Sequence, residues 1–361
     1  MTAIKLTSER HRVPGFLDAQ ALFLDRGWTD GLPIIPPTEE LVGRFVATSG
    51  RGAQDVVAAI PEQGRGVTVE KIAVNAVMAG CRLEYMPILV AAMRAMSDPR
   101  FSLHSTTVSG ATAPLLIVSG PAVRALGINA SFSVFGPGHQ ANATLGRAVR
   151  LILQNVCGGT PGQADKATLG HPGKYSYCIG ESSDRNPWDP FGAQHGLPAD
   201  TSAVTVFAAE APIYARNDWS QEPELILATV ADAMLIGHYT GGSFVVVMSP
   251  LHAGHIAQRG WSPADVRRFL AERARRSVAD LKRAGRLAGA VEPADEDHWR
   301  GAVDSPEQIL IVVAGGHLYG YSAVVPPWVG GHESIPNTLA VESPDAASRE
   351  TSEEDRACLT S

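Results

Sequence analysis

The sequence predicts an α/β protein in which a layered mixed sheet is covered by helices, and two kinds of periodicity lead to this prediction. Short apolar runs bounded by Gly, Pro or Ser are typical of buried strands. Such runs occur at 114–119, 203–208, 243–249 and 308–314. Segments with helical periodicity separate these runs, which favours layers of helix and sheet. The clearest helical segments are 85–96, 141–156, 223–235 and 262–284, the last beginning with the N-cap and first-turn pair Ser262-Pro263.

A weak internal repeat indicates that the fold contains a duplicated helix-strand-helix unit. Helix, strand and Pro-led helix follow one another over 88–128, and the same order returns over 226–257. Three prolines within 28–38 exclude a helix there, so we expect an extended strap over the core. The chain is therefore divided into an N-terminal helical and proline-rich strap (1–60), a first α/β half with Cys81 and Gly-rich loops (61–200), a second α/β half (201–340) and a flexible acidic tail with Cys358 (341–361).

Composition and charge limit the classes of function. The chain has 361 residues, 45% of them hydrophobic, which is enough to bury a large core. A formal net charge of -7 without a basic stripe disfavours a nucleic-acid partner. The N-terminus lacks the apolar region of a signal peptide and no run of 18 apolar residues occurs, so we expect a cytoplasmic protein with no membrane partner. We expect a homo-oligomer that acts on a small-molecule substrate.

Cys81 is the candidate nucleophile. It ends the apolar segment that begins at residue 69, and Arg82 follows it directly. A neighbouring guanidinium can lower the pKa of a thiol and so favour the reactive thiolate. The alternative is a packed core residue, because free cysteines are among the most buried residue types. The substrate-binding residues expected from the same segment are Lys71, Asn75, Arg82 and Glu84. The four cysteines have no C-x-x-C spacing, which indicates reduced thiols rather than a disulfide framework.

Two glycine-rich loops are expected to complete the site. The first, 135–147, precedes a helix whose initial amides could hold an anion beside His139 and Asn142. The second, 169–181, contains Lys174, Tyr175 and Ser176, a possible acid/base and oxyanion-stabilising set. We expect these three residues to approach Cys81 in space and to act with it in catalysis. His171 and Glu181 of the same loop are further candidates for substrate binding. The alternative is a surface loop whose polar residues satisfy turns.

Histidines provide a competing hypothesis. His252 and His255 follow a predicted strand, and His317 lies in a later loop, as do His238 and His332-Glu333. Neutral imidazoles with a carboxylate could bind a divalent metal, although the H-x-x-H spacing lacks the H-E-x-x-H arrangement. No organic cofactor is implied, because the dinucleotide and P-loop fingerprints are missing.

Residues 30–38, Asp-Gly-Leu-Pro-Ile-Ile-Pro-Pro-Thr, resemble the opening of the UGSC family, small proteins named for a selenocysteine-Gly-Ser-Cys motif. The span from Asp30 to Pro326 resembles longer bacterial relatives of that family, in which we expect counterparts of 70–81, 135–144 and 172–176. The resemblance implies no particular reaction. The namesake motif is missing, since the nearest segment is Cys157-Gly-Gly-Thr.

The sequence thus leads to the hypothesis of a thiol-dependent hydrolase or lyase that uses Cys81, without a cofactor, on a small polar or anionic substrate. The first alternative is a hydrolase or lyase dependent on a divalent metal bound by His252, His255 and His317. The second alternative is a non-catalytic binding subunit of a partner enzyme.

Overall fold

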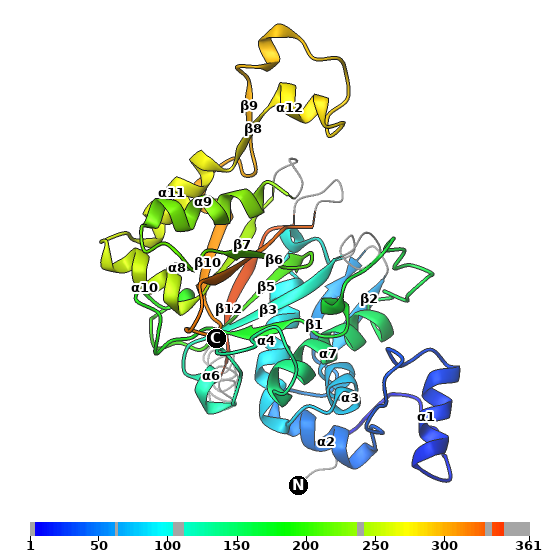
Figure 1. The fold of residues 1–361 in the computed structure, drawn as a ribbon. Coiled ribbons are helices and arrows are strands. Elements are labelled where there is room, and N and C mark those ends of the chain that lie inside the picture. The colour runs from blue at the N-terminus through cyan, green and yellow to red at the C-terminus, as the bar shows by residue number, and fades with distance from the viewer. Residues whose placement is uncertain (1–3, 62–63, 104–111, 237–241, 329–333, 343–361) are drawn as a thin grey trace, which may run out of the picture.

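The computed structural model describes residues 4–61, 64–103, 112–236, 242–328 and 334–342. Two four-stranded sheets form its centre (Figure 1). The first sheet contains β3 (Ala113–Ser119), β4 (Cys178–Gly180), β5 (Ala203–Ala209) and β12 (Asn337–Ala340), in the order β12-β5-β3-β4. The second contains β6 (Ile213–Arg216), β7 (Phe244–Met248), β10 (Ile309–Val313) and β11 (Tyr321–Val325), in the order β10-β7-β11-β6. The four predicted strands are confirmed as β3, β5, β7 and β10.

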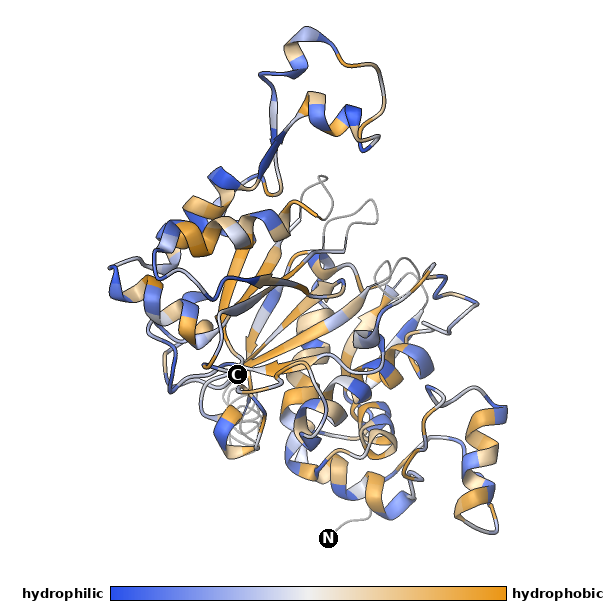
Figure 2. Ribbon diagram, in the orientation of Figure 1, coloured by the Kyte–Doolittle hydropathy of each residue, from blue (hydrophilic) through white to orange (hydrophobic). Residues whose placement is uncertain are grey.

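The two sheets pack face to face. Leu115 and Ile117 of β3 share one apolar core with Val245 and Val247 of β7. The alternate residues, such as Leu116, face the opposite way, toward helices. Side chains alternate along a strand, so a strand that is apolar at every position needs cover on both faces. The result is four layers of helix, sheet, sheet and helix, with the apolar strands at the centre (Figure 2). This arrangement confirms the predicted α/β class.

Helices cover the outer face of each sheet. The first sheet is covered by α4 (Met86–Met96) and α7 (Gln140–Asn155), and α3 (Val69–Ala79) and α2 (Glu39–Thr48) pack on these two helices. The second is covered by α9 (Pro223–Met234), α10 (Pro250–Gln258) and α11 (Pro263–Arg273). The smaller elements are α1 (Phe16–Asp25), β1 (Val56–Ile60), β2 (Arg65–Thr68), η2 (Leu83–Tyr85), η3 (Pro99–Phe101), α6 (Ala122–Ala125), η4 (Pro172–Lys174), α8 (Phe191–Gln194), η5 (Pro293–Asp295) and η6 (Pro306–Gln308). No described helix has both the length and the apolar character that a membrane span requires.

The predicted repeat has a counterpart in the topology. β3 pairs in parallel with β4 and antiparallel with β5, and β7 pairs in the same way with β10 and β11. Each of the two central strands follows a long helix, α4 or α9, and leads into another helix, α6 or α10. At the sheet edges, β12 pairs with β5 as β6 pairs with β11. The two sheets are therefore built on one plan.

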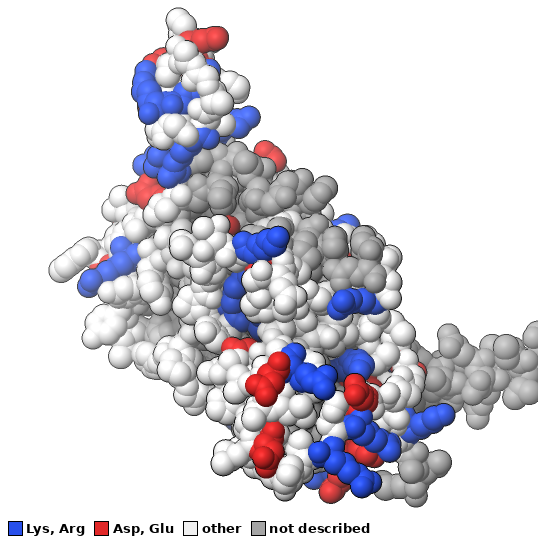
Figure 3. Space-filling model, turned by 90° about the vertical axis from the view of Figure 1, so that its right-hand side faces the viewer, with Lys and Arg blue, Asp and Glu red and all other residues white. Residues whose placement is uncertain are grey.

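The predicted helix at 262–284 is wrong beyond Arg273. Residues Arg275–Ser277 form β8, which pairs antiparallel with β9 (Trp299–Gly301), and α12 (Val278–Arg283) follows β8. The side chain of Ser277 accepts a hydrogen bond from Asp280 N and thereby caps a new helix, so two short helices resembled one long helix in the sequence. Residues 275–301 form an arm that extends away from the sheets (Figure 1). Lys and Arg side chains gather on this arm (Figure 3).

Candidate functional site

A cavity of about 530 Å³ lies between the N-terminal segment and α3, and we refer to it as the N-terminal cavity. Small-molecule sites typically span about 300–1,000 Å³. Its apolar lining is formed by Leu6, Val13, Ala19, Leu22, Phe23, Trp28, Pro36, Pro37, Val42, Val74, Met78 and Val156. Its polar lining is formed by Ser8, Glu9, Arg10, His11, Thr38, Glu39, Glu70, Lys71, Asn75 and Asn155. Ligand sites typically combine apolar contact area with polar groups that fix the orientation of the ligand.

The inner wall of the cavity is one face of α3. Lys71, Val74, Asn75 and Met78 recur at helical spacing, so all four line the cavity. Asn75 Nδ2 donates to Lys71 O at 2.9 Å, and Asn75 Oδ1 accepts from Asn155 Nδ2 at 2.8 Å. Lys71 Nζ donates to Ser8 Oγ at 3.2 Å. Two residues that the sequence predicted to bind substrate, Lys71 and Asn75, therefore share one cavity.

Glu70 fixes the N-terminal segment over this cavity. Its carboxylate, only 1% exposed, accepts from Thr7 N at 2.9 Å, from Ser8 N at 2.8 Å and from Gln54 Nε2 at 2.6 Å. Burial alone would raise the pKa of Glu70, but these donors outweigh burial and lower the pKa to about 2. The carboxylate is therefore ionised and its acceptor sites are occupied, which makes it a structural group at the edge of the cavity.

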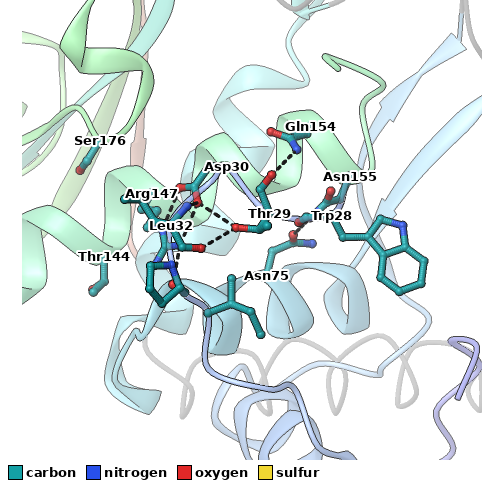
Figure 4. Close-up of polar contacts among 12 residues, drawn as sticks. Trp28, Thr29, Asp30, Leu32, Asn75, Thr144, Arg147, Gln154, Asn155 and Ser176 are labelled. Carbon is teal, nitrogen blue, oxygen red and sulfur yellow. Dashed lines mark hydrogen bonds and ion pairs between the residues drawn. The ribbon is translucent and has the colours of Figure 1, made fainter. Parts of the chain in front are cut away.

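The proline-rich strap forms another edge, and α7 holds it in place (Figure 4). As predicted, residues 28–37 contain neither helix nor strand. Gln154 Nε2 donates to Gly27 O and Thr29 O, each at 2.9 Å, and Asn155 Nδ2 donates to Trp28 O at 2.9 Å. Pro36, Pro37 and Thr38 then line the cavity. Residues of the two segments 30–38 and 70–81 thus meet at one cavity.

Cys81 lies outside the cavity lining. Gly80 ends α3 in the left-handed region (φ 83°), and the Cys81 thiol turns toward α7, where Sγ donates to Thr144 O at 3.3 Å. Burial raises the pKa of Cys81 to about 12, although the Thr144 hydrogen bond and the charge of Arg147 act in the opposite direction. The thiol form is therefore strongly favoured at neutral pH.

Arg82 was expected to lower the pKa of the Cys81 thiol, but among the described residues it contacts other groups. The Arg82 guanidinium pairs with Glu84 at 3.3 Å and lies over the Tyr85 ring, 5.8 Å from its centroid. Arg82 and Glu84 are exposed and do not line the N-terminal cavity. The side chains of Cys81 and Arg82 point apart because the backbone is extended at Arg82 (φ -86°, ψ 156°), where successive side chains alternate in direction.

Of the three predicted catalytic residues in the loop at 171–181, Ser176 hydrogen-bonds to α7 and Lys174 forms an ion pair with Asp165 in a neighbouring loop. Ser176 Oγ donates to Asn142 O at 3.1 Å, so Ser176 and Cys81 both contact carbonyls in the first turns of α7. Lys174 instead contacts both carboxylate oxygens of Asp165, at 2.8 and 2.6 Å. Burial lowers the pKa of Lys174, while Asp165 acts in the opposite direction. Tyr175 is exposed. The expected constellation of Cys81 with Lys174, Tyr175 and Ser176 is thus only partly assembled.

Asn142 is a structural residue rather than an open ligand group. Its Nδ2 donates to Asn129 O at 2.9 Å and to Cys178 O at 3.1 Å, and its Oδ1 accepts from Asn129 N at 2.7 Å. The side chain is buried, and these contacts join α7 to the preceding loop and to β4. His139 is exposed at the N-cap of α7 and makes no side-chain cap.

His171 and Glu181 also have structural partners. His171 Nδ1 accepts from Gly173 N at 3.1 Å, and its ring packs edge-on against Tyr177. Glu181 is buried, and its Oε1 accepts from Asn186 Nδ2 and Phe191 N, each at 2.8 Å. Burial raises the pKa of Glu181. Neither residue lines the N-terminal cavity.

The histidines do not form a cluster in the described part of the chain. His252 is buried, with Nδ1 2.8 Å from Ser322 Oγ and Nε2 2.9 Å from Asn217 O. His317 packs against the Phe132 ring. Among the described residues, no group of three or more His, Cys, Asp or Glu side chains is placed to hold a metal ion. His238, His332, Glu333 and Cys358 lie outside the described residues. The metal hypothesis stays a prediction.

Comparison of the chain with protein-family models, with curated proteins and with solved structures finds no match. The resemblance to the UGSC family therefore stays a prediction. The fold and the cavity define the molecule as a four-layer α/β/β/α protein with an internal space of small-molecule size.

Sequence reasoning missed the outer wall of the cavity. Ser8, His11, Phe23 and Trp28 belong to a segment that we expected only to cover the core. One feature of the sequence could have indicated this wall: the helix Phe16–Asp25 is apolar on nearly every side. A helix with apolar residues all round needs an apolar environment on more than one face. Leu22 and Phe23 of α1 line the cavity on one of those faces.

Proposed function

We propose that the chain is an enzyme of small-molecule metabolism, a hydrolase or lyase, whose substrate binds in the N-terminal cavity. One observation carries this proposal. Lys71 and Asn75 of α3 and Pro36, Pro37 and Thr38 of the strap line the same cavity of about 530 Å³. A concave, mostly apolar space with a few convergent polar groups is the default location of a substrate site.

The lining favours a compact substrate with an apolar part and an anionic group. Val74, Met78 and Phe23 offer apolar contact. Lys71 offers a positive charge, and its hydrogen-bond partner among the described residues is the hydroxyl of Ser8, whereas Glu39 of the same lining pairs with Arg10. An ammonium group in a partly apolar cavity binds a carboxylate or phosphate through charge-assisted hydrogen bonds. We therefore propose that Lys71 holds the anionic group of the substrate.

Cys81 as the nucleophile remains a separate proposal with less support. Cys81 does not line the cavity, and burial raises the pKa of its thiol to about 12. A non-catalytic binding subunit is the second candidate function. It is favoured by the hydrogen bonds that already engage Glu70, Asn75 and Asn155 within the protein. We keep the expectation of a cytoplasmic homo-oligomer as part of the proposal.

Ligand binding by purified protein tests the proposed site. A panel of small carboxylates and phosphate esters is screened for an increase in the thermal unfolding midpoint, since a ligand that binds the folded state raises that midpoint. The Lys71→Met variant should bind a stabilising ligand about tenfold to a hundredfold more weakly, the usual effect of losing one charge-assisted hydrogen bond. Lys166→Met serves as the matched control, because Lys166 is exposed and lies outside the cavity lining.

The two outcomes are distinct. Equal affinity in Lys71→Met and the wild-type protein would refute Lys71 as the anion-binding group. Mass spectrometry of the bound ligands after incubation separates an enzyme, which converts them, from a binding subunit, which returns them unchanged.

A further inference from the structure

A second, much smaller hollow lies where the start of β3 meets α7 and the loop that contains Lys174. It measures about 10 Å³ and is lined by Thr112, Ala113, Pro114, Gly146, Val149, Arg150, Gly173 and Lys174. That volume holds about one water-sized atom. We propose that this hollow binds a small anion, either chloride or one oxygen of a carboxylate or phosphate group.

Charge is the first observation that supports an anion. Arg150 and Lys174 both line the hollow, and their side chains are only 13% and 16% exposed. Both pair with Asp165, at 3.2 Å from Arg150 Nη2 and 2.6 Å from Lys174 Nζ. Asp165 itself does not line the hollow. Two cations with one carboxylate leave an excess of one positive charge within the described residues, and a buried excess charge is costly unless a counter-charge accompanies it.

Thr112 is the second and independent observation. Its side chain is 4% exposed, and Oγ1 is buried without a hydrogen-bond partner in the described part of the chain. A buried hydroxyl without a partner costs about 1–3 kcal/mol, so such groups normally mark a bound water or ion. A water molecule could satisfy the hydroxyl but would leave the excess charge. An anion accepts a hydrogen bond from Thr112 and balances the charge as well.

Close packing of the backbone brings these groups together. A Cβ on Gly146 of α7 would lie 2.4 Å from Tyr177 N and 2.5 Å from Ser176 Oγ, so only glycine allows this approach. Lys174 is thereby held next to Arg150 on the following turn of α7. The donors left over after Asp165 is satisfied are those of an ammonium, a guanidinium and a hydroxyl, which together suit a compact anion.

Thermal unfolding in a low-salt buffer tests the proposal, with sodium chloride, sodium phosphate and sodium acetate titrated separately. Two variants remove one group each: Thr112→Val keeps the shape of the side chain, and Lys174→Met leaves Arg150 and Asp165 as a balanced pair. We expect about tenfold weaker anion stabilisation in Thr112→Val and none in Lys174→Met. Lys166→Met is the control for general salt effects, because this lysine is exposed.

A response to chloride alone would identify a halide site, and a response to phosphate or acetate would identify an oxyanion site. Equal responses in the wild-type protein, Thr112→Val and Lys174→Met would overturn the proposal. Crystals grown in sodium bromide provide a second readout, because an anomalous peak should lie within hydrogen-bond distance of Lys174 Nζ. A bromide map without a peak there, together with no stabilisation of the wild-type protein by phosphate or acetate, would also overturn the proposal, even if Lys174→Met failed to fold.

Discussion

Arg147 of α7 binds Asp30 of the strap through two parallel hydrogen bonds, Nε to Oδ2 and Nη2 to Oδ1, each 2.8 Å long. Arg147 Nη2 also donates to Pro33 O at 2.8 Å. Both side chains are largely buried, at 14% and 5% exposure. Burial by itself would raise the pKa of Asp30, but the hydrogen bonds and charge of Arg147 keep it below its usual range. This pair fixes the strap that forms one edge of the N-terminal cavity.

Removal of Arg147 alone should therefore be strongly destabilising. In Arg147→Met, the carboxylate of Asp30 stays buried without its counter-charge, and the free energy of unfolding should fall by about 3–5 kcal/mol. The double variant Asp30→Leu/Arg147→Met should lose less, because no unpaired charge remains. Urea denaturation measures the free energy of unfolding of both variants, with Arg44→Met as the control at an exposed position. A loss in Arg147→Met no larger than that of the control would contradict this role.

Glu70 should control the stability of the fold in acid. Its pKa is lowered from 4.5 to about 2, so its contribution is complete above about pH 4.5 and is lost as the pH falls toward 2. A shift of that size corresponds to about 3 kcal/mol. Glu70→Gln should therefore be less stable at neutral pH and should show a flatter decline in acid. Unfolding free energies between these pH values test this, and Glu224→Gln is the exposed control. Parallel pH profiles for Glu70→Gln and the wild-type protein would rule it out.

The described thiols should react slowly with alkylating agents. Burial raises the pKa of Cys81, Cys157 and Cys178 to about 12 each. At neutral pH such thiols form roughly a thousandfold less thiolate than an ordinary cysteine. Iodoacetamide labelling followed by intact mass measures this in a Cys358→Ser background, so that Cys358 contributes no signal. Rapid stoichiometric labelling that Cys81→Ser abolishes would instead support the thiol-dependent hydrolase or lyase.

The arm should be dispensable for the rest of the fold. Ala302 N donates to Ala274 O at 2.8 Å, so the two ends of the arm already meet at the body. Replacement of residues 275–301 by a short Gly-Ser linker should change the free energy of unfolding by no more than about 1 kcal/mol. Thermal unfolding and ligand binding in the N-terminal cavity are the measurements. An insoluble or unfolded product would show that the arm supports the body.

The outer side of α1 offers a test of the expected homo-oligomer. Phe16, Leu17 and Leu24 are 57%, 78% and 56% exposed, although their helix is mostly apolar. Exposed apolar groups of this kind often mark an interface between proteins. If the expected homo-oligomer forms through this face, Leu17→Asp/Leu24→Asp should have a smaller mass than the wild-type protein in size-exclusion chromatography with light scattering. Val291→Asp, on the arm, is the control. An unchanged mass in the α1 variant would exclude this face as the interface.

The strands β3, β5, β7 and β10 were predictable because they are buried along their whole length and almost wholly apolar. The edge strands β6 and β12 were not, because they are four residues long and only partly buried. Part of the site was also predictable, since Lys71 and Asn75 interrupt an apolar helix at one face. The partner of Lys174 was not, because Asp165 lies nine residues away in a loop without periodicity. The direction of the Cys81 thiol depends on the left-handed conformation of Gly80, and the residues next to Cys81 in the sequence do not indicate that direction.

The position of β12 has a consequence for how the chain folds during synthesis. Thr205 and Thr338 are hydrogen-bonded across β5 and β12 although 133 residues separate them. All strands of the second sheet lie within that interval. A growing chain therefore exposes one edge of β5 while the second sheet is being made, and an unpaired edge can join strands of other chains. Rapid collapse of the second sheet, whose strands are closer in sequence, would shorten that vulnerable period by bringing β12 near its partner.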